Sequence, residues 1–281
     1  MKILIMGLSK SGTTALFYLI KNSFKEKLET IFERKALAEK RDLLNSNHHV
    51  LLKILLFSGA LKKGDYDELV EVADKKILII RDPRDNIISE LLYYGGYHVT
   101  WSKPYRDRKK AVALLKEKEA HNQGVSVIKL FEILCDRDKE ALSHYMRERY
   151  ENVIKFMERY PEAHIVKYED MLQNSIDNLE DYLGFALTQQ TEIGTAHEYV
   201  IRKKTGGDWK NWFTAEDIIF FKPILERYMD TFDYTPDWTP HAKPSILPEH
   251  SSEYFENLVK KKRNAQKPKH SIKRLLKRLF S

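Results

Sequence analysis

The chain has 281 residues, of which 42% are hydrophobic and 32% are charged, a composition typical of a folded protein with room for a large core. No stretch approaches the roughly 18 apolar residues that a transmembrane helix needs. The chain enters an apolar strand at once, which argues against a secretory leader. Its one cysteine, Cys135, excludes an internal disulfide and is typical of a reducing compartment. We therefore expect a cytoplasmic protein.

The positive charge is concentrated at the end of the chain. Ten lysines and arginines, and no acidic residue, follow Val259. Their combined charge of +10 exceeds the formal net charge of the whole chain, which is +7. The rest of the chain is therefore mildly acidic, so the basic isoelectric point does not indicate a nucleic-acid-binding domain. We expect no nucleic-acid partner.

The first residues combine a strand, a small polar loop and a helix. Lys2 to Met6 is an aliphatic run of strand length, Gly7 to Gly12 is a loop, and Thr14 to Phe24 has the apolar spacing of a helix. Loop N–H groups and the positive end of the helix dipole converge on one spot in such a unit. This pattern predicts a phosphate-binding loop, with an ordinary glycine–serine turn as the alternative.

The position of the lysine distinguishes this loop from a Walker A loop, in which lysine directly follows the second glycine. Here Thr13 has that place, and Lys10 lies inside the loop. A nucleoside-triphosphate kinase without that lysine would lack its clamp on the β- and γ-phosphates. The loop therefore indicates a different phosphate ligand. Lys10 is expected to be an ammonium without any shift of its pKa.

Several further segments have the pattern of buried strands: Glu29–Glu33, Val50–Phe57, Lys75–Ile80 and His164–Tyr168. They are apolar rather than alternating, and helical stretches separate most of them, which predicts a parallel sheet covered by helices. Gly64 to Tyr66 is expected to be a turn. Helices are expected within Lys103–Tyr160, at Ser175–Gly184, at Glu216–Tyr228 with a kink or break at Pro223, and at Glu253–Lys262.

A second candidate anion site follows the strand that ends at Ile80. Arg81 stands at the strand end, where ligands gather in open parallel sheets, and Ser89 follows two turns into the next helix. Arg81 offers charged donors and Ser89 a hydroxyl, so the two can hold one phosphate. Surface salt bridges within Arg81 to Asp85 are the alternative.

Four motifs resemble, in their order, those of sulfotransferases that use 3′-phosphoadenosine 5′-phosphosulfate (PAPS). Lys10 to Thr14 is similar to the 5′-phosphosulfate loop, Arg81 to Ser89 to the 3′-phosphate motif, and Val166 to Met171 to the Tyr-Glu-Asp segment. Ile201 to Asn211 resembles the late Arg-Lys-Gly…Gly-Asp-Trp-Lys-Asn loop. The resemblance implies a P-loop-like α/β fold of three layers, with a central parallel sheet flanked by helices. It also implies transfer of a sulfuryl group from PAPS to a hydroxyl or amine, without a metal.

The residues that the resemblance assigns to PAPS are Lys10, Ser11, Gly12, Thr13, Thr14, Arg81, Ser89, Tyr168, Arg202 and Lys203. The first five would hold the 5′-phosphate end, with Lys10 bridging to the leaving oxygen. Tyr168 would lie against the nucleotide, and the others would hold the 3′-phosphate. A catalytically silent nucleotide-binding protein and a P-loop kinase are the alternatives.

Two positions depart from the family pattern. Many cytosolic members carry a tryptophan after the Thr-Thr pair, where it stacks on adenine, and this chain has Ala15. At the position of the glycine in the Arg-Lys-Gly trio, this chain has Lys204. Gly206 and Gly207 are therefore expected to make the turn there.

The expected general base is Glu33. Many relatives place a histidine after the second long strand, but the matching stretch here begins at Lys53 and has none. Relatives that act on sugars place a glutamate after the first helix, at about the distance of Glu33, and partial burial would suit it to this role. A solvated salt bridge is the alternative for Glu33. His48 and His49 are rivals at the amino end of a strand, and Lys53 is a second catalytic candidate or a snorkelling side chain.

Residues 1–240 are expected to form the sulfotransferase domain, with a helical acceptor-side insertion at about 97–160, and residues 241–281 a basic C-terminal extension. Within the extension, residues 271–280 have apolar and basic residues on opposite faces of a helix. That pattern is typical of peripheral contact with an anionic membrane, here the inner face, with a solvated or docked tail as the alternative. The acceptor is expected to be a glycan or glycolipid, on whose sugar ring Tyr93, Tyr94 and Trp101 could stack.

Overall fold

The computed structural model describes residues 1–57, 63–99, 105–188, 193–195 and 197–265. Trp101 and the segment 271–280 lie outside these residues. Within the described part, no helix is both long and apolar enough to span a membrane.

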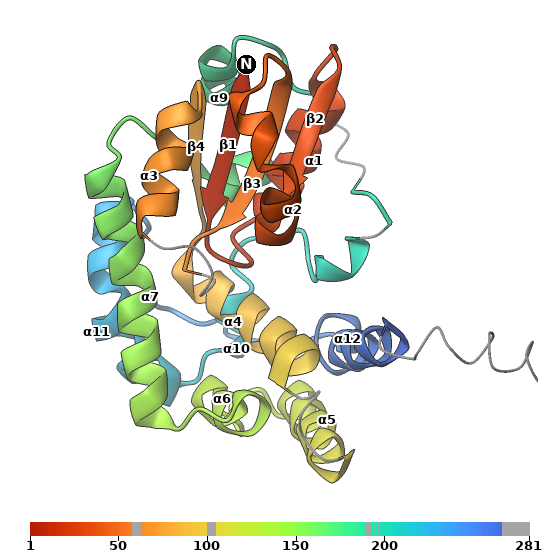
Figure 1. Ribbon diagram of the computed structural model, residues 1–281. Coiled ribbons are helices and arrows are strands. Elements are labelled where there is room, and N and C mark those ends of the chain that lie inside the picture. The colour runs from red at the N-terminus through yellow and green to blue at the C-terminus, as the bar shows by residue number, and fades with distance from the viewer. Residues whose placement is uncertain (58–62, 100–104, 189–192, 196, 266–281) are drawn as a thin grey trace, which may run out of the picture.

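A five-stranded parallel sheet forms the centre of the fold (Figure 1). Its strands are β1 (Lys2–Gly7), β2 (Leu28–Phe32), β3 (His49–Leu55), β4 (Lys75–Ile80) and β5 (His164–Lys167), in the order β2-β3-β1-β4-β5. The parallel sheet confirms the prediction made from the apolar strand pattern. Because β1 pairs with both β3 and β4, its carboxyl end lies at the middle of the sheet edge.

The helices are α1 (Thr13–Ser23), α2 (Glu33–Lys40), α3 (Lys63–Val72), α4 (Pro83–Tyr93), α5 (Tyr105–Ala120), α6 (Val127–Cys135), α7 (Lys139–Arg159), α8 (Tyr168–Leu172), α9 (Asp177–Leu183), α10 (Trp209–Trp212), α11 (Ala215–Thr231) and α12 (Ser252–Ala265). Shorter helical turns lie at η1 (Arg41–Asn45), η2 (Tyr94–Val99), η3 (Glu198–Val200) and η4 (Pro248–His250).

Alternate residues of each strand enter different hydrophobic clusters, as the pleat of a strand requires. Ile3 and Ile5 of β1 pack with α1 and α9 on one face of the sheet. Leu4 and Met6 pack in the larger cluster, which includes residues of α2, α3, α4, α7 and α11. Both faces of the sheet are therefore buried, which explains why its strands are apolar throughout.

The remaining helices lie beyond the carboxyl edge of the sheet. Figure 1 shows α4, α5, α6 and α12 at this edge, below the strands. The buried carboxylate of Asp217 in α11 accepts hydrogen bonds from Val127 N (2.9 Å) and Ile128 N (3.0 Å), so it joins α11 to the first turn of α6. Part of residues 241–281 belongs to the same core, because Tyr254, Phe255 and Leu258 of α12 are buried in the larger cluster.

Two local predictions differ from the structure. Gly64 to Tyr66 was expected to be a turn but lies in α3 (Lys63–Val72), because Tyr66, Leu69 and Val70 form an apolar face that packs on the sheet. Pro223 does not interrupt α11, which runs from Ala215 to Thr231 and is stabilised at its start by a capping box.

Candidate functional site

The loop between β1 and α1 has the shape of an anion cradle. Gly12 has φ +97°, and a Cβ atom there would lie 2.3 Å from Tyr168 Cδ2. Glycine is therefore required by both the backbone and the neighbouring ring. No side chain caps the start of α1, so the N–H groups of its first turn point toward the loop without a side-chain partner.

Lys10 has a left-handed backbone, with φ +67°. Its Nζ donates a hydrogen bond to Val200 O and lies 4.3 Å from the centroid of the Tyr93 ring. Its own carbonyl accepts a hydrogen bond from Arg81 Nη1 at 3.1 Å. A non-glycine residue in this conformation persists only where its surroundings hold it, and such residues cluster at functional sites.

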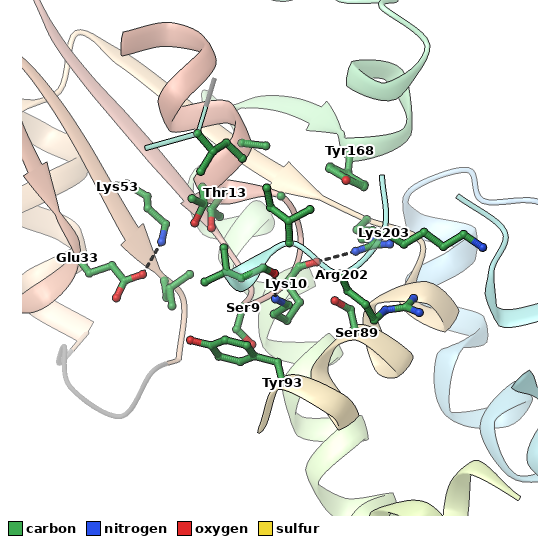
Figure 2. A pocket seen from close by; sticks show the side chains of 18 residues that line it. Ser9, Lys10, Thr13, Glu33, Lys53, Ser89, Tyr93, Tyr168, Arg202 and Lys203 are labelled. Carbon is green, nitrogen blue, oxygen red and sulfur yellow. Dashed lines mark hydrogen bonds and ion pairs between the residues drawn. The ribbon is translucent and has the colours of Figure 1, made fainter. Parts of the chain in front are cut away.

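A single pocket joins most of the residues predicted from the sequence. It is lined by Ser9, Lys10, Gly12, Thr13, Thr14, Ala15, Glu33, Lys53, Leu55, Arg81, Ser89, Tyr93, Tyr168, Ile193, Val200, Ile201, Arg202 and Lys203. Figure 2 shows Lys10 between the Glu33–Lys53 pair on one side and Ser89, Arg202 and Lys203 on the other. Two bound molecules can therefore meet at Lys10 from opposite sides.

The pocket has many more cations than anions. Lysine and arginine supply five of its lining residues, and Glu33 is the one carboxylate among them. Within the described part of the chain, the buried Nε atoms of Arg81 and Arg202 have no hydrogen-bond partner. Burial, followed by the charges of Arg81, Arg202 and Lys53, holds the pKa of Lys10 well below its usual value. The expectation of an unshifted pKa for Lys10 is therefore wrong for the protein without an anion.

Arg202 and Lys203 are positioned by a buried carboxylate. Asp208 accepts from Arg202 Nη1 at 2.7 Å and from Lys203 Nζ at 2.9 Å. Burial opposes ionisation of Asp208, but the two cations prevail and lower its pKa to about 2. The buried Asp85 of α4 in turn accepts from Gly207 N at 2.6 Å, so the loop is tied to the helix that also carries Ser89.

The departures from the family pattern have local structural consequences. Gly207 has a left-handed backbone, with φ +76°. A glycine therefore makes a turn in this loop although Lys204 occupies the position of the family's glycine. Lys204 itself is exposed. In place of a tryptophan at position 15, the pocket is lined near the loop by Ala15, Ile193 and Ile201. The Tyr168 ring, with the Arg81 guanidinium 4.7 Å from its centroid, is the aromatic surface on this side.

Glu33 and Lys53 form an ion pair at the pocket wall. Glu33 accepts a hydrogen bond from Lys53 Nζ, and its backbone is also left-handed, with φ +62°. Burial lowers the pKa of Lys53, and the Glu33 charge partly offsets that effect. The side chain of Glu33 is 42% exposed, so its carboxylate is open to a molecule that enters the pocket.

Four predicted residues are not part of the pocket lining. His48 is exposed, and His49 binds the amino group of Met1 at the start of β3, so both lie at the opposite edge of the sheet. The hydroxyl of Ser11 is buried in the loop, where it donates to Leu8 O at 2.8 Å. Tyr94 is also absent from the lining; its ring stacks on that of His98.

A network behind the loop was not predicted from the sequence. Arg149 of α7 donates to Ser9 O and Ser9 Oγ, both at 3.1 Å, and Asn86 Nδ2 donates to Ser9 O at 2.9 Å. Arg149 also lies 2.7 Å from the Glu90 carboxylate. Because Arg149 belongs to no motif and is distant in sequence from the loop, no local pattern could identify it.

Comparisons with known proteins give one matching family model and a similar fold. The family model of the sulfotransferase domain matches residues 1–192. Among solved structures, the chain is similar to mouse sulfotransferase SULT7A1 complexed with PAP, with a TM-score of 0.52, 17% identity and coverage of 83% of this chain and 86% of that chain. That likeness shows a common fold. No curated protein sequence matches the chain.

Replacement of Asp208 tests its role in holding the two cations. Because the folded pKa of Asp208 is about 2, below the ordinary value of an aspartate, its ionisation stabilises the fold above about pH 4 and this effect is lost as the pH falls through about 2. We expect Asp208→Asn to lower the free energy of unfolding at neutral pH by about 2 kcal/mol, a deficit that shrinks toward acid pH.

The measurement is urea unfolding from pH 7 downward, with the exposed Asp230→Asn as control. A deficit of the same size at every pH would contradict the assigned ionisation of Asp208.

Proposed function

The chain belongs to the family of PAPS-dependent sulfotransferases, and we propose that Lys10 and Glu33 of this site direct the sulfuryl group in line to a hydroxyl of a glycan or glycolipid. The single observation that carries this proposal is the pocket itself. It places a surplus of buried cations beside a loop that binds anions, and one accessible carboxylate faces Lys10 across it. Residues 1–240 are proposed as the domain responsible.

The residues present fit PAPS as the donor, because cations outnumber carboxylates in the pocket lining and the buried Nε atoms of Arg81 and Arg202 have no hydrogen-bond partner among the described residues. Thr13, Thr14 and the start of α1 would hold the 5′-phosphate through hydroxyl and N–H groups. Arg81, Ser89, Arg202 and Lys203 would hold the 3′-phosphate, since a phosphomonoester with about two charges satisfies several charged donors at once. When bound, PAPS supplies a sulfuryl group joined to a phosphate that can leave.

Lys10 is proposed to stabilise the charge that develops on the leaving phosphate. Its ammonium is held by Val200 O and the Tyr93 ring, so little reorganisation is needed at the moment of transfer. Protonation of Lys10 is disfavoured in the free protein by burial and by Arg81. A bound anion reverses this balance, because it neutralises the neighbouring cations and favours the charged lysine.

Glu33 is proposed as the base that takes the proton of the acceptor hydroxyl. It lines the pocket from the side opposite Arg202 and Lys203, and Lys53 fixes its carboxylate by an ion pair. A base must lie within hydrogen-bond reach of its proton, and the exposure of Glu33 leaves it accessible to an acceptor. Lys53 is proposed to orient Glu33 and to add positive charge near the sulfuryl group.

The acceptor class is proposed from the wall around Lys10. Tyr93 lines the pocket, and its ring stacks with those of Tyr97 at 5.4 Å and Tyr199 at 6.5 Å between centroids. Tyrosines with an apolar face and a hydroxyl suit the faces and hydroxyls of a sugar ring better than a wholly apolar acceptor. Sulfation of a carbohydrate hydroxyl is therefore the activity that we propose.

Replacing Lys10 tests the transfer step. We expect Lys10→Ala to lower the rate of PAPS consumption, measured with a panel of carbohydrate acceptors, by about 100-fold or more, because removing one charged donor to the developing anion has effects of this size. The exposed Lys25→Ala serves as the control for loss of one positive charge and should keep the wild-type rate. A Lys10→Ala rate near that of wild type would remove Lys10 from this role.

Replacing Glu33 tests the base. Glu33→Gln keeps the shape of the side chain but cannot accept a proton, so we expect kcat to fall by about 100-fold and to lose its rise with pH on the acid side. His48→Ala should retain both the rate and the pH profile, because His48 lies outside the pocket lining. Full activity in Glu33→Gln would overturn the assignment.

A further inference from the structure

Helix α12 brings two lysines to the tyrosines beside Lys10. Lys261 Nζ lies 4.1 Å from the centroid of Tyr199, and Lys262 Nζ lies 4.5 Å from that of Tyr97. Tyr97 and Tyr199 stack on each other with centroids 5.4 Å apart, and both stack on Tyr93. We call Tyr93, Tyr97 and Tyr199 the tyrosine wall. Lys10 lies over the ring of Tyr93, and the two α12 lysines lie over the other two rings of the wall.

The attachment of α12 to the site is direct. The hydroxyl of Tyr254 donates to Val200 O at 3.5 Å, and the same carbonyl accepts from Lys10 Nζ. Phe255 and Leu258 lie in the main core, and α12 packs on α4, α5 and η2. These contacts fix α12, the helix that carries Lys261 and Lys262, relative to Lys10.

The two lysines have no carboxylate partner within the described residues. No ion pair there involves Lys261 or Lys262, and Lys261 is exposed. Neither lines the pocket around the phosphate loop, so that pocket does not place them on the nucleotide. Their charges remain available to another molecule that binds beside the tyrosine wall.

The tyrosine wall connects Glu33 with the α12 lysines. Tyr93 lines the same pocket as Glu33, and its ring stacks on those of Tyr97 and Tyr199, over which Lys262 and Lys261 lie. The charges of Lys262 and Glu33 also act on one side chain, His98, whose pKa is lowered by burial and then by Lys262 and raised by Glu33. An acceptor that lies along the wall can therefore reach both Glu33 and the lysine pair.

We propose that this enzyme selects anionic acceptors, saccharides bearing a carboxylate or an existing sulfate, and that Lys261 and Lys262 bind this second charge beyond the tyrosine wall. The inference rests on the proposed function and extends it from a glycan to an acidic glycan. The wall would support the sugar ring, Glu33 would face the reacting hydroxyl, and the lysines would fix which ring of the chain is presented. They are specificity residues and take no part in the transfer itself.

Binding to the protein saturated with adenosine 3′,5′-bisphosphate tests the inference without a requirement for turnover. The probes are a tetrasaccharide of alternating hexuronate and N-acetylhexosamine and its neutral counterpart with reduced carboxyl groups. We expect wild type to bind the acidic probe about tenfold more tightly, as two partly exposed charge pairs can give, and the preference to weaken with salt. In Lys261→Gln/Lys262→Gln the preference should fall below about threefold, with unchanged affinity for the nucleotide.

The matched control is Lys260→Gln/Arg263→Gln, which removes two exposed positive charges from the same helix, neither of them on a ring of the tyrosine wall among the described contacts. This control should keep the wild-type preference. Equal binding of the two probes to wild type, or an unchanged preference in Lys261→Gln/Lys262→Gln, would overturn the inference and leave the proposed function intact. The inference would also be overturned if neutral saccharides, but not acidic ones, supported PAPS consumption. If no saccharide served as an acceptor, that result would contradict the proposed function instead.

Discussion

The site depends on one electrostatic imbalance: several cations are buried around the β1–α1 loop without enough carboxylates to balance them. Burial disfavours the charge of Lys10, and the nearby charges of Arg81 and Arg202 disfavour it further. Burying like charges together is costly for a fold unless a ligand offsets them. The arrangement is therefore suited to a doubly phosphorylated nucleotide, which supplies negative charge at both of its ends.

The rest of the fold holds those cations in place before a ligand arrives. Asp208 fixes Arg202 and Lys203, and Asp85 ties their loop to α4. Arg149 reaches from α7 to the carbonyl of Ser9. The parallel sheet places the phosphate loop at the end of β1 and Arg81 at the end of its neighbour β4. A preorganised site of this kind avoids much of the ordering cost that binding would otherwise incur.

Much of this arrangement could be predicted from the sequence, because it is encoded locally. The loop from Lys10 to Thr14 and the spacing from Arg81 to Ser89 each lie within one strand–loop–helix unit, and parallel strands bring such units to one edge. Glu33 was predicted from the resemblance to relatives that carry a glutamate at about this distance from the loop, and it lines the same pocket. Its role as a base remains a prediction.

The features that the sequence did not predict depend on contacts between distant segments. Arg149 reaches the loop across the helical part of the fold, and nothing in the pattern of α7 distinguishes it from a surface arginine. Lys261 and Lys262 belong to a run of basic residues that is typical of a solvent-exposed surface. Only the packing of α12 brings them to the tyrosine wall. The helix α3 was missed because Gly64 suggested a turn, whereas burial of its apolar face determined the helix.

The charge imbalance can be measured most directly through protons. In calorimetric titrations with adenosine 3′,5′-bisphosphate over a series of pH values from about 8 upward, both phosphates are already ionised, so a change in bound protons reports on the protein. Because the nucleotide should raise the lowered pKa of Lys10, the account predicts net proton uptake, visible as different binding heats in buffers of different ionisation enthalpy and absent in Lys10→Arg. Binding without proton uptake in the wild-type protein, or no binding at all, would contradict it.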